Sequence, residues 1–130
     1  MFISAKELMQ RKGVIEERKA QTLDVTIEGL GEWRFRVPSA SEIMDAQMFA
    51  KSHKSAEESG DTFLLYNQCE MPDLHDAQLQ NAYGVHGCAI VHKLLLAGEV
   101  EALARALMQK AGYNGGTVDI IEKGANEVKN

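Results

Sequence analysis

The stretch LDVTIEGLGEWRFRV, residues 23–37, predicts a β-hairpin. Apolar and polar residues alternate along both of its halves, which is the period of a strand with one buried face. Between the halves, Gly29-Leu30-Gly31 reads as a three-residue loop, in which glycine can take a positive φ. Folding the chain about Leu30 predicts these opposite pairs: Ile27–Trp33, Val25–Phe35, Leu23–Val37, Asp24–Arg36 and Thr26–Arg34. A lone hairpin is unstable in water, so we expect its apolar face to pack on helices.

The segments on either side of the hairpin predict helices. Two capping boxes, Ser4-x-x-Glu7 and Ser39-x-x-Glu42, predict helices over residues 5–20 and 40–51. Further helices are expected over residues 62–69, 77–83, 88–97, 99–111 and 118–123. The predicted fold class is therefore mainly α (α+β): one small helical domain spanning residues 1–130, with an N-terminal antiparallel hairpin at 22–37 packed on a helical part at 39–124.

The first predicted helix, within residues 1–20, has a thin apolar face. It offers Leu8, Met9 and Ile15, has Gly13 near its middle, and carries charges at most other positions. A helix with so little to bury gains little from packing. We expect it to be mobile or to be completed by a partner.

Composition indicates an ordinary globular domain. The chain has 130 residues, of which 45% are hydrophobic and 25% charged, and its net charge is −5. Both nucleic acids and anionic membranes demand a basic surface, so neither is an expected partner. The longest apolar run, residues 94–97, is far too short to span a bilayer, and no secretory signal is evident. We expect a soluble, cytoplasmic protein.

Metal binding is the first chemical alternative. Cys88 and His92 are four residues apart on a predicted helix, close to His86, and Cys69 and His75 could complete a zinc site. The chain lacks both the Cys-x-x-Cys and the His-Glu-x-x-His spacing, and Cys88 can equally pack as a small apolar residue. We therefore predict no metal site.

Catalytic groups are not evident either. Neither cysteine has an orienting partner that the sequence places near it. The acidic residues at helix ends are typical of caps: Asp61, Glu70, Asp73 and Asp76. A helix-turn-helix over residues 89–111 would need more positive charge on its second helix. We predict no cofactor and no enzymatic activity.

Apolar side chains outside the expected core favour a binding protein. Met44 and Met48 lie to one side of the inner stripe of their predicted helix, and methionine suits surfaces that accept varied apolar partners. Leu96 falls on the polar face of the predicted 88–97 helix. Core filling remains the alternative for each single residue. The predicted partner-binding groove comprises Met44, Met48, Leu95, Leu96, Val100, Leu103 and Leu107.

Several short motifs together resemble one family. They are the strand WRFRVP at 33–38, Cys-x-x-Pro at 69–72, LQNAYG at 79–84, GEV at 98–100, AGY at 111–113 and the Lys-Asn end at 129–130. In this order, over essentially the whole chain, the sequence resembles the XkdN-like phage tail assembly chaperones.

The resemblance implies a function. It implies a protein that acts in the cytoplasm of the bacterial host, binds the phage tape-measure protein and is displaced when tail-tube subunits polymerise. It implies no catalytic residue, leaves self-association open and involves the tail-tube protein as a further partner. Two other classes stay open: a structural minor tail or connector subunit, and a small acidic regulatory protein.

Overall fold

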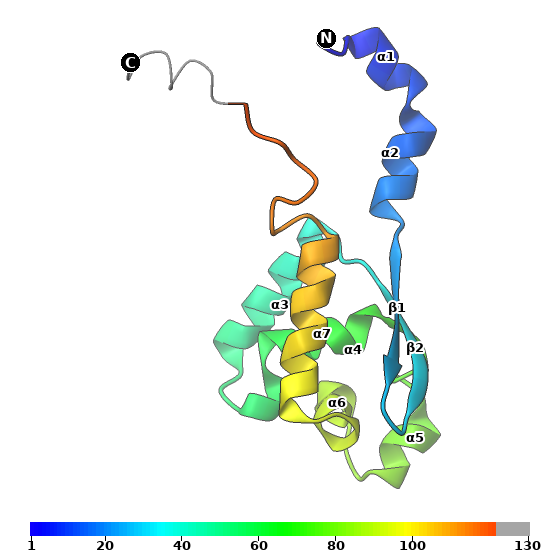
Figure 1. Cartoon of the computed structure of the whole chain (residues 1–130). Coiled ribbons are helices and arrows are strands. Elements are labelled where there is room, and N and C mark those ends of the chain that lie inside the picture. Colours follow the sequence, from blue (N-terminus) through cyan, green and yellow to red (C-terminus); the bar gives the residue numbers. More distant parts are fainter. Residues whose placement is uncertain (122–130) are drawn as a thin grey trace.

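The computed structural model describes residues 1–121 of the chain, and Figure 1 shows its arrangement. Helices α3, α4, α6 and α7 lie beside a small sheet, and α1 and α2 extend away from them in line with β1 (Figure 1). We call residues 1–20 the N-terminal arm and residues 21–121 the body. The elements are α1 (Ala5–Gln10), α2 (Lys12–Lys19), β1 (Thr22–Ile27), β2 (Gly31–Arg36), α3 (Ala40–Ser52), η1 (Ala56–Glu58), α4 (Gly60–Gln68), β3 (Cys69–Met71), α5 (Ala77–Ala82), η2 (Gly87–Ala89), α6 (Ile90–Leu94) and α7 (Ala97–Lys110), where η marks a 3-10 helix.

The hairpin forms from the predicted strands, but the predicted register is wrong by two residues. Val25 pairs with Trp33, and Ile27 pairs with Gly31. The turn closes earlier than expected because the Leu30 amide donates to the Ile27 carbonyl at 2.9 Å, with Gly29 at a φ of 80°. A shift of two residues keeps every side chain on its own face, so the predicted apolar face is still the buried one.

The sheet has three antiparallel strands in the order β1-β2-β3, whereas the sequence predicted only a hairpin. In the third strand, Cys69 pairs with Phe35 and Met71 with Arg34. This strand follows directly on α4 and is only three residues long, too short to show a readable alternation. The helix predicted to reach Cys69 therefore ends at Gln68.

One core joins the sheet to the helices, as the apolar face of the hairpin predicted. Phe35 of β2, Leu65 of α4 and Leu107 of α7 are completely buried in it. α4 lies between α3 and α7 and packs on both. The body is thus built around α4, and α3 and α7 bury apolar residues beside it.

Helix starts were predicted better than helix continuity. Ser39 caps α3 and Asp76 caps α5 through their side chains, as predicted. The predicted helix over 5–20 is divided at Arg11, and the helix over 88–97 ends at Leu94. The break predicted at Gly98 lies instead at residues 95–96, where the backbone is extended.

The last predicted helix, over 118–123, is wrong for its first four residues. Residues 118–121 are not helical, and residues 122–123 lie outside the described part of the chain. The turn expected at 114–116 is present. Within residues 1–121, no helix is long and apolar enough to cross a bilayer.

Candidate functional site

Four of the seven residues predicted to line a binding groove lie in the core. α7 turns its apolar stripe towards α4, because the i, i+3, i+4 spacing that makes a binding face also makes a packing face. A groove formed by all seven side chains is therefore not present on this surface. The buried four are Leu95, Val100, Leu103 and Leu107.

The other three residues are exposed at the surface. Met44 and Met48 of α3 are 59% and 61% exposed, and Leu96 is 72% exposed. The two methionines are four residues apart and so lie on one side of the helix. Leu96 lies at the start of α7 instead. Of the seven predicted groove residues, the structure therefore places only Met44 and Met48 together on one exposed side.

Leu96 is exposed for a different reason from the one predicted. It is not on a helix face but is the extended N-cap residue of α7. Its amide donates to the Glu99 carboxylate at 2.7 Å, which satisfies one of the free donors at the helix start. The backbone is held in place while the apolar side chain points to solvent.

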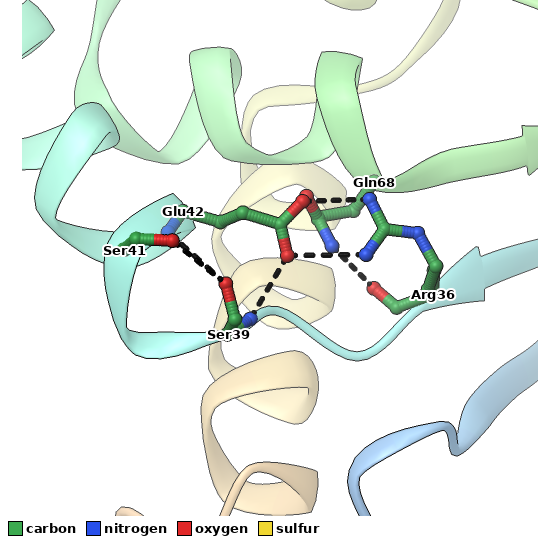
Figure 2. Close-up of polar contacts among 5 residues, drawn as sticks. All are labelled: Arg36, Ser39, Ser41, Glu42 and Gln68. Atoms are coloured by element: carbon green, nitrogen blue, oxygen red, sulfur yellow. Dashed lines mark hydrogen bonds and ion pairs between the residues drawn. The ribbon is translucent and has the colours of Figure 1, made fainter.

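A network of polar contacts fixes α3 to the sheet (Figure 2). The Arg36 guanidinium donates to both oxygens of the Glu42 carboxylate, at 3.1 and 2.6 Å. Glu42 also accepts from the Ser39 amide at 2.9 Å, which completes the capping box. The Arg36 contact lowers the pKa of Glu42 to about 2, so this carboxyl is charged at neutral pH. A helix held in this way presents Met44 and Met48 in a fixed position.

Gln68 links α4 to the same network. Its side-chain amide donates to the Arg36 carbonyl at 2.8 Å, as Figure 2 shows. Its Oε1 is buried and has no hydrogen-bond partner among the described residues. The bond from Nε2 is therefore the side-chain contact by which Gln68 helps to position α4, and the buried Oε1 takes no part in it.

A small cleft between α3 and α4 adjoins this network. It has a volume of about 260 Å³ and is lined by Glu42, Asp45, Phe63, Leu64, Asn67 and Gln68. Phe63 stacks on Phe49 of α3 at a centroid distance of 4.3 Å, and Phe49 stacks on His53 at 3.8 Å. All three rings are partly exposed, so they add aromatic surface to α3. The sequence analysis did not predict this surface. The four-residue spacing of Phe49 and His53 could have predicted their contact, but nothing local places Phe63 beside them.

The N-terminal arm is a second surface with unpartnered apolar side chains. Every residue from 1 to 20 is exposed, including Phe2, Leu8, Met9 and Ile15. The Ser4 capping box forms as predicted, so the start of the helix is defined locally. No residue of the arm is buried, as expected for a helix with little to pack.

The residues considered for metal or thiol chemistry are used for packing. Burial raises the pKa of Cys69 to about 12 and also raises that of Cys88, which opposes formation of the reactive thiolates. His92 is hydrogen-bonded to Thr62 at 2.8 Å, and His75 stacks on Tyr66. Within residues 1–121, no three histidine, cysteine or acidic side chains are close enough together to hold a metal ion.

Comparison with known proteins gives one finding. The family model described as "Phage XkdN-like tail assembly chaperone protein, TAC" matches residues 7–125. No curated protein and no solved structure shows significant similarity to the chain.

Proposed function

The chain belongs to the XkdN-like phage tail assembly chaperone family, and from this premise we propose its function. It binds the phage tape-measure protein and keeps that protein soluble until the tail tube polymerises. The site of action would be the cytoplasm of the bacterial host. Binding would involve protein surfaces alone, with no catalytic residue and no cofactor.

The observation that carries the proposal is the exposed methionine side of α3. Met44 and Met48 are more than half exposed on a helix that Glu42 and Arg36 tie to the sheet. A partner that covers apolar surface left exposed by the fold stabilises the complex by about 25 cal/mol for each Å² covered. Flexible methionine side chains can adjust to different apolar partners, which would suit a long, largely helical client.

The binding mode we favour lays an apolar helix face of the client along α3. Helix-in-groove recognition of this kind uses apolar side chains at i, i+3, i+4 and i+7. The partly exposed rings of Phe49 and Phe63, which stack on each other, would be a second apolar contact on a neighbouring side of α3. Leu96, on the α6–α7 connection, would be a separate contact. Because these patches are small, tube subunits could displace the chaperone without any energy source.

Net charge supports a role in solubility. The chain carries 19 acidic and 14 basic residues, so a complex with an apolar client retains a negative surface. Like charges on neighbouring complexes oppose aggregation. A client with apolar helices would stay dispersed for as long as it is covered.

The test is co-expression of the chain with the tape-measure protein of the same phage, followed by affinity purification and measurement of the soluble fraction. We expect the client to be soluble and to co-purify only when the chain is present. The double variant Met44→Ser/Met48→Ser should lose most of the captured client. Met71→Ser is the matched control, because Met71 is 53% exposed but lies on β3.

Two results would contradict the proposal. If the client stays insoluble and no complex forms, a structural tail subunit becomes the better interpretation of the family membership. If the α3 double variant and the Met71 control capture equal amounts of client, the chaperone function stands but its site is not on α3.

A further inference from the structure

A cleft of about 430 Å³ lies where the N-terminal arm joins the body. Ile15, Arg18 and Lys19 of α2 line one side of it. Val37, in the connection between β2 and α3, also lines the cleft. Lys110 and Ala111, at the end of α7, line its other side. Figure 1 shows α2 and the end of α7 on either side of this region.

The lining of this arm cleft combines apolar side chains with positive charge only. Arg18, Lys19 and Lys110 line it, and no carboxylate side chain does. Among the described residues, none of these three cations forms a salt bridge. The body has the opposite sign, since residues 21–121 contain 14 acidic and 7 basic residues, whereas the arm contains 3 acidic and 5 basic residues. The cleft is therefore a basic, partly apolar site on an acidic molecule.

The arm is fixed at the edge of this cleft by its attachment, not by packing. The Val37 amide donates to the Gln21 carbonyl at 3.0 Å, which ties residue 21 to the end of β2. Only Ala20 separates this point from the end of α2 at Lys19. Ile15 lies three residues before Arg18 and four before Lys19, so all three share a helix face. That face lines the cleft, and Ile15 remains exposed there.

We infer that the arm cleft docks an apolar peptide segment that carries carboxylates, supplied by another protein. The inference rests on the proposed function in taking the client as the source of that segment. Charge complementarity selects the segment: its carboxylates would meet the three cations, and its apolar side chains would cover Ile15, Val37 and Ala111. An acidic segment would be repelled from the rest of the body and steered towards this cleft.

One segment of the chain itself has the same chemistry. Residues 118–121, Val-Asp-Ile-Ile, follow Thr117, which lines the cleft, and they are exposed. An intramolecular competitor of this kind would weaken docking, because its effective concentration is high. In this structure residues 118–121 do not line the cleft, so it is open to a client segment.

The test uses two synthetic helical peptides of about four turns with the full-length chain. Both carry leucine at i, i+3, i+4 and i+7; one has glutamate and the other lysine at the flanking positions. We expect the glutamate peptide to bind, to shift the amide resonances of Ile15, Val37 and Ala111, and to bind more weakly as salt is raised. The lysine peptide should bind at least tenfold more weakly.

Charge reversals in the cleft supply matched variants. Lys110→Glu and Arg18→Glu should each weaken the glutamate peptide about tenfold, whereas Lys93→Glu, an exposed site on α6, should leave it unchanged. Arg18 lies on a helix with no buried residue, so its variant keeps the core intact. Equal binding of both peptides, or equal losses with Lys93→Glu, would overturn the inference. Shifts confined to other surfaces, or to residues 118–121, would overturn it as well.

Capture of the tape-measure protein separates this inference from the proposed function. If the wild-type chain captures the client but the glutamate peptide does not bind, the arm-cleft inference falls and the chaperone function stands. If the peptide binds at the cleft but the client is never captured, the docking site stands and the chaperone function falls.

Discussion

The N-terminal arm and α7 are both helical, but they use their apolar residues in opposite ways. In α7, Val100, Leu103 and Leu107 are spaced by three and four residues and are all buried against the body. In α1 and α2 no residue is buried, although the two helices carry Leu8 and Ile15. A local cap and helix-forming residues can start a helix, whereas only packing makes it part of the core.

This difference separates stability from binding. Residues that the body buries determine whether the chain folds, so changing them should remove stability and binding together. Residues that the arm and the outer side of α3 leave in water contribute little to folding. They are therefore available to a partner. The predictions below compare the two kinds of position directly.

The largest contrast is expected between two neighbouring leucines. Leu95 is 6% exposed and Leu96 is 72% exposed. Leu95→Glu would bury an unpaired carboxylate and should cost more than about 4 kcal/mol, a large share of the stability of a domain of this size. Leu96→Glu should change the free energy of unfolding by less than about 0.5 kcal/mol. Thermal unfolding followed by circular dichroism measures both, and equal losses would show that the Leu96 side chain packs in the core as that of Leu95 does.

Truncating one leucine in each region gives the next effect. Leu107→Ala removes a completely buried side chain and should cost about 2–5 kcal/mol, because the cavity cannot fully collapse. Leu8→Ala in the arm should leave the free energy of unfolding unchanged within about 0.5 kcal/mol. Urea titration gives both values. A loss of more than 1 kcal/mol for Leu8→Ala would mean that the arm packs on the body in solution.

The contact between Glu42 and Arg36 should contribute a smaller, pH-dependent amount. The pKa of Glu42 is about 2 in the folded protein against an ordinary 4.5, so the contact stabilises the fold above pH 4.5 and is lost as the pH falls towards 2. After allowing for the solvent around Arg36, we expect Glu42→Gln to cost about 1–2 kcal/mol at pH 7 and almost nothing near pH 2.

Urea titrations of Glu42→Gln and the wild type at several pH values would check this sign. Glu101→Gln is the matched control, since Glu101 pairs with Arg105 on the surface of α7 and both are mostly exposed. It should change stability little at any pH. A Glu42→Gln loss that is the same at pH 2 and pH 7 would contradict the assigned ion pair.

The last comparison sets the labelling rate of thiols in the body against that of a thiol in the arm. Cys69 and Cys88 are buried, and their raised pKa values should make both react slowly with a disulfide reagent at pH 8. Met9→Cys in the arm should react at the rate of an unfolded peptide, because Met9 is exposed. Fast labelling of the native cysteines without denaturant would show that the body opens readily.

The sequence predicted the elements whose signals are local. Alternation identified β1 and β2, and side-chain caps at Ser39 and Asp76 identified the starts of α3 and α5. The register failed because the choice between Gly29 and Leu30 as the centre of the turn depends on backbone geometry. The third strand failed because Cys69 to Met71 becomes a strand only by pairing with β2.

The candidate site was harder to predict than the fold. The spacing of Val100, Leu103 and Leu107 fits a binding face and a core face equally, and only tertiary packing decides between them. Met44 and Met48 were identified because they lie outside the inner stripe of their own helix. The arm cleft joins residues near 15–19, 37 and 110, and no local pattern relates positions so far apart in the chain.

Hydrogen exchange of the full-length chain, alone and with the tape-measure protein, tests most directly whether the surfaces left in water are the ones that bind. We expect client-dependent protection in α2, in α3 and at the end of α7, where the arm cleft lies, with the amides of α4 and the middle of α7 unchanged. Protection confined to α4 and α7, with α2 and α3 exchanging as in the free chain, would contradict the division between a folded body and unpartnered binding surfaces.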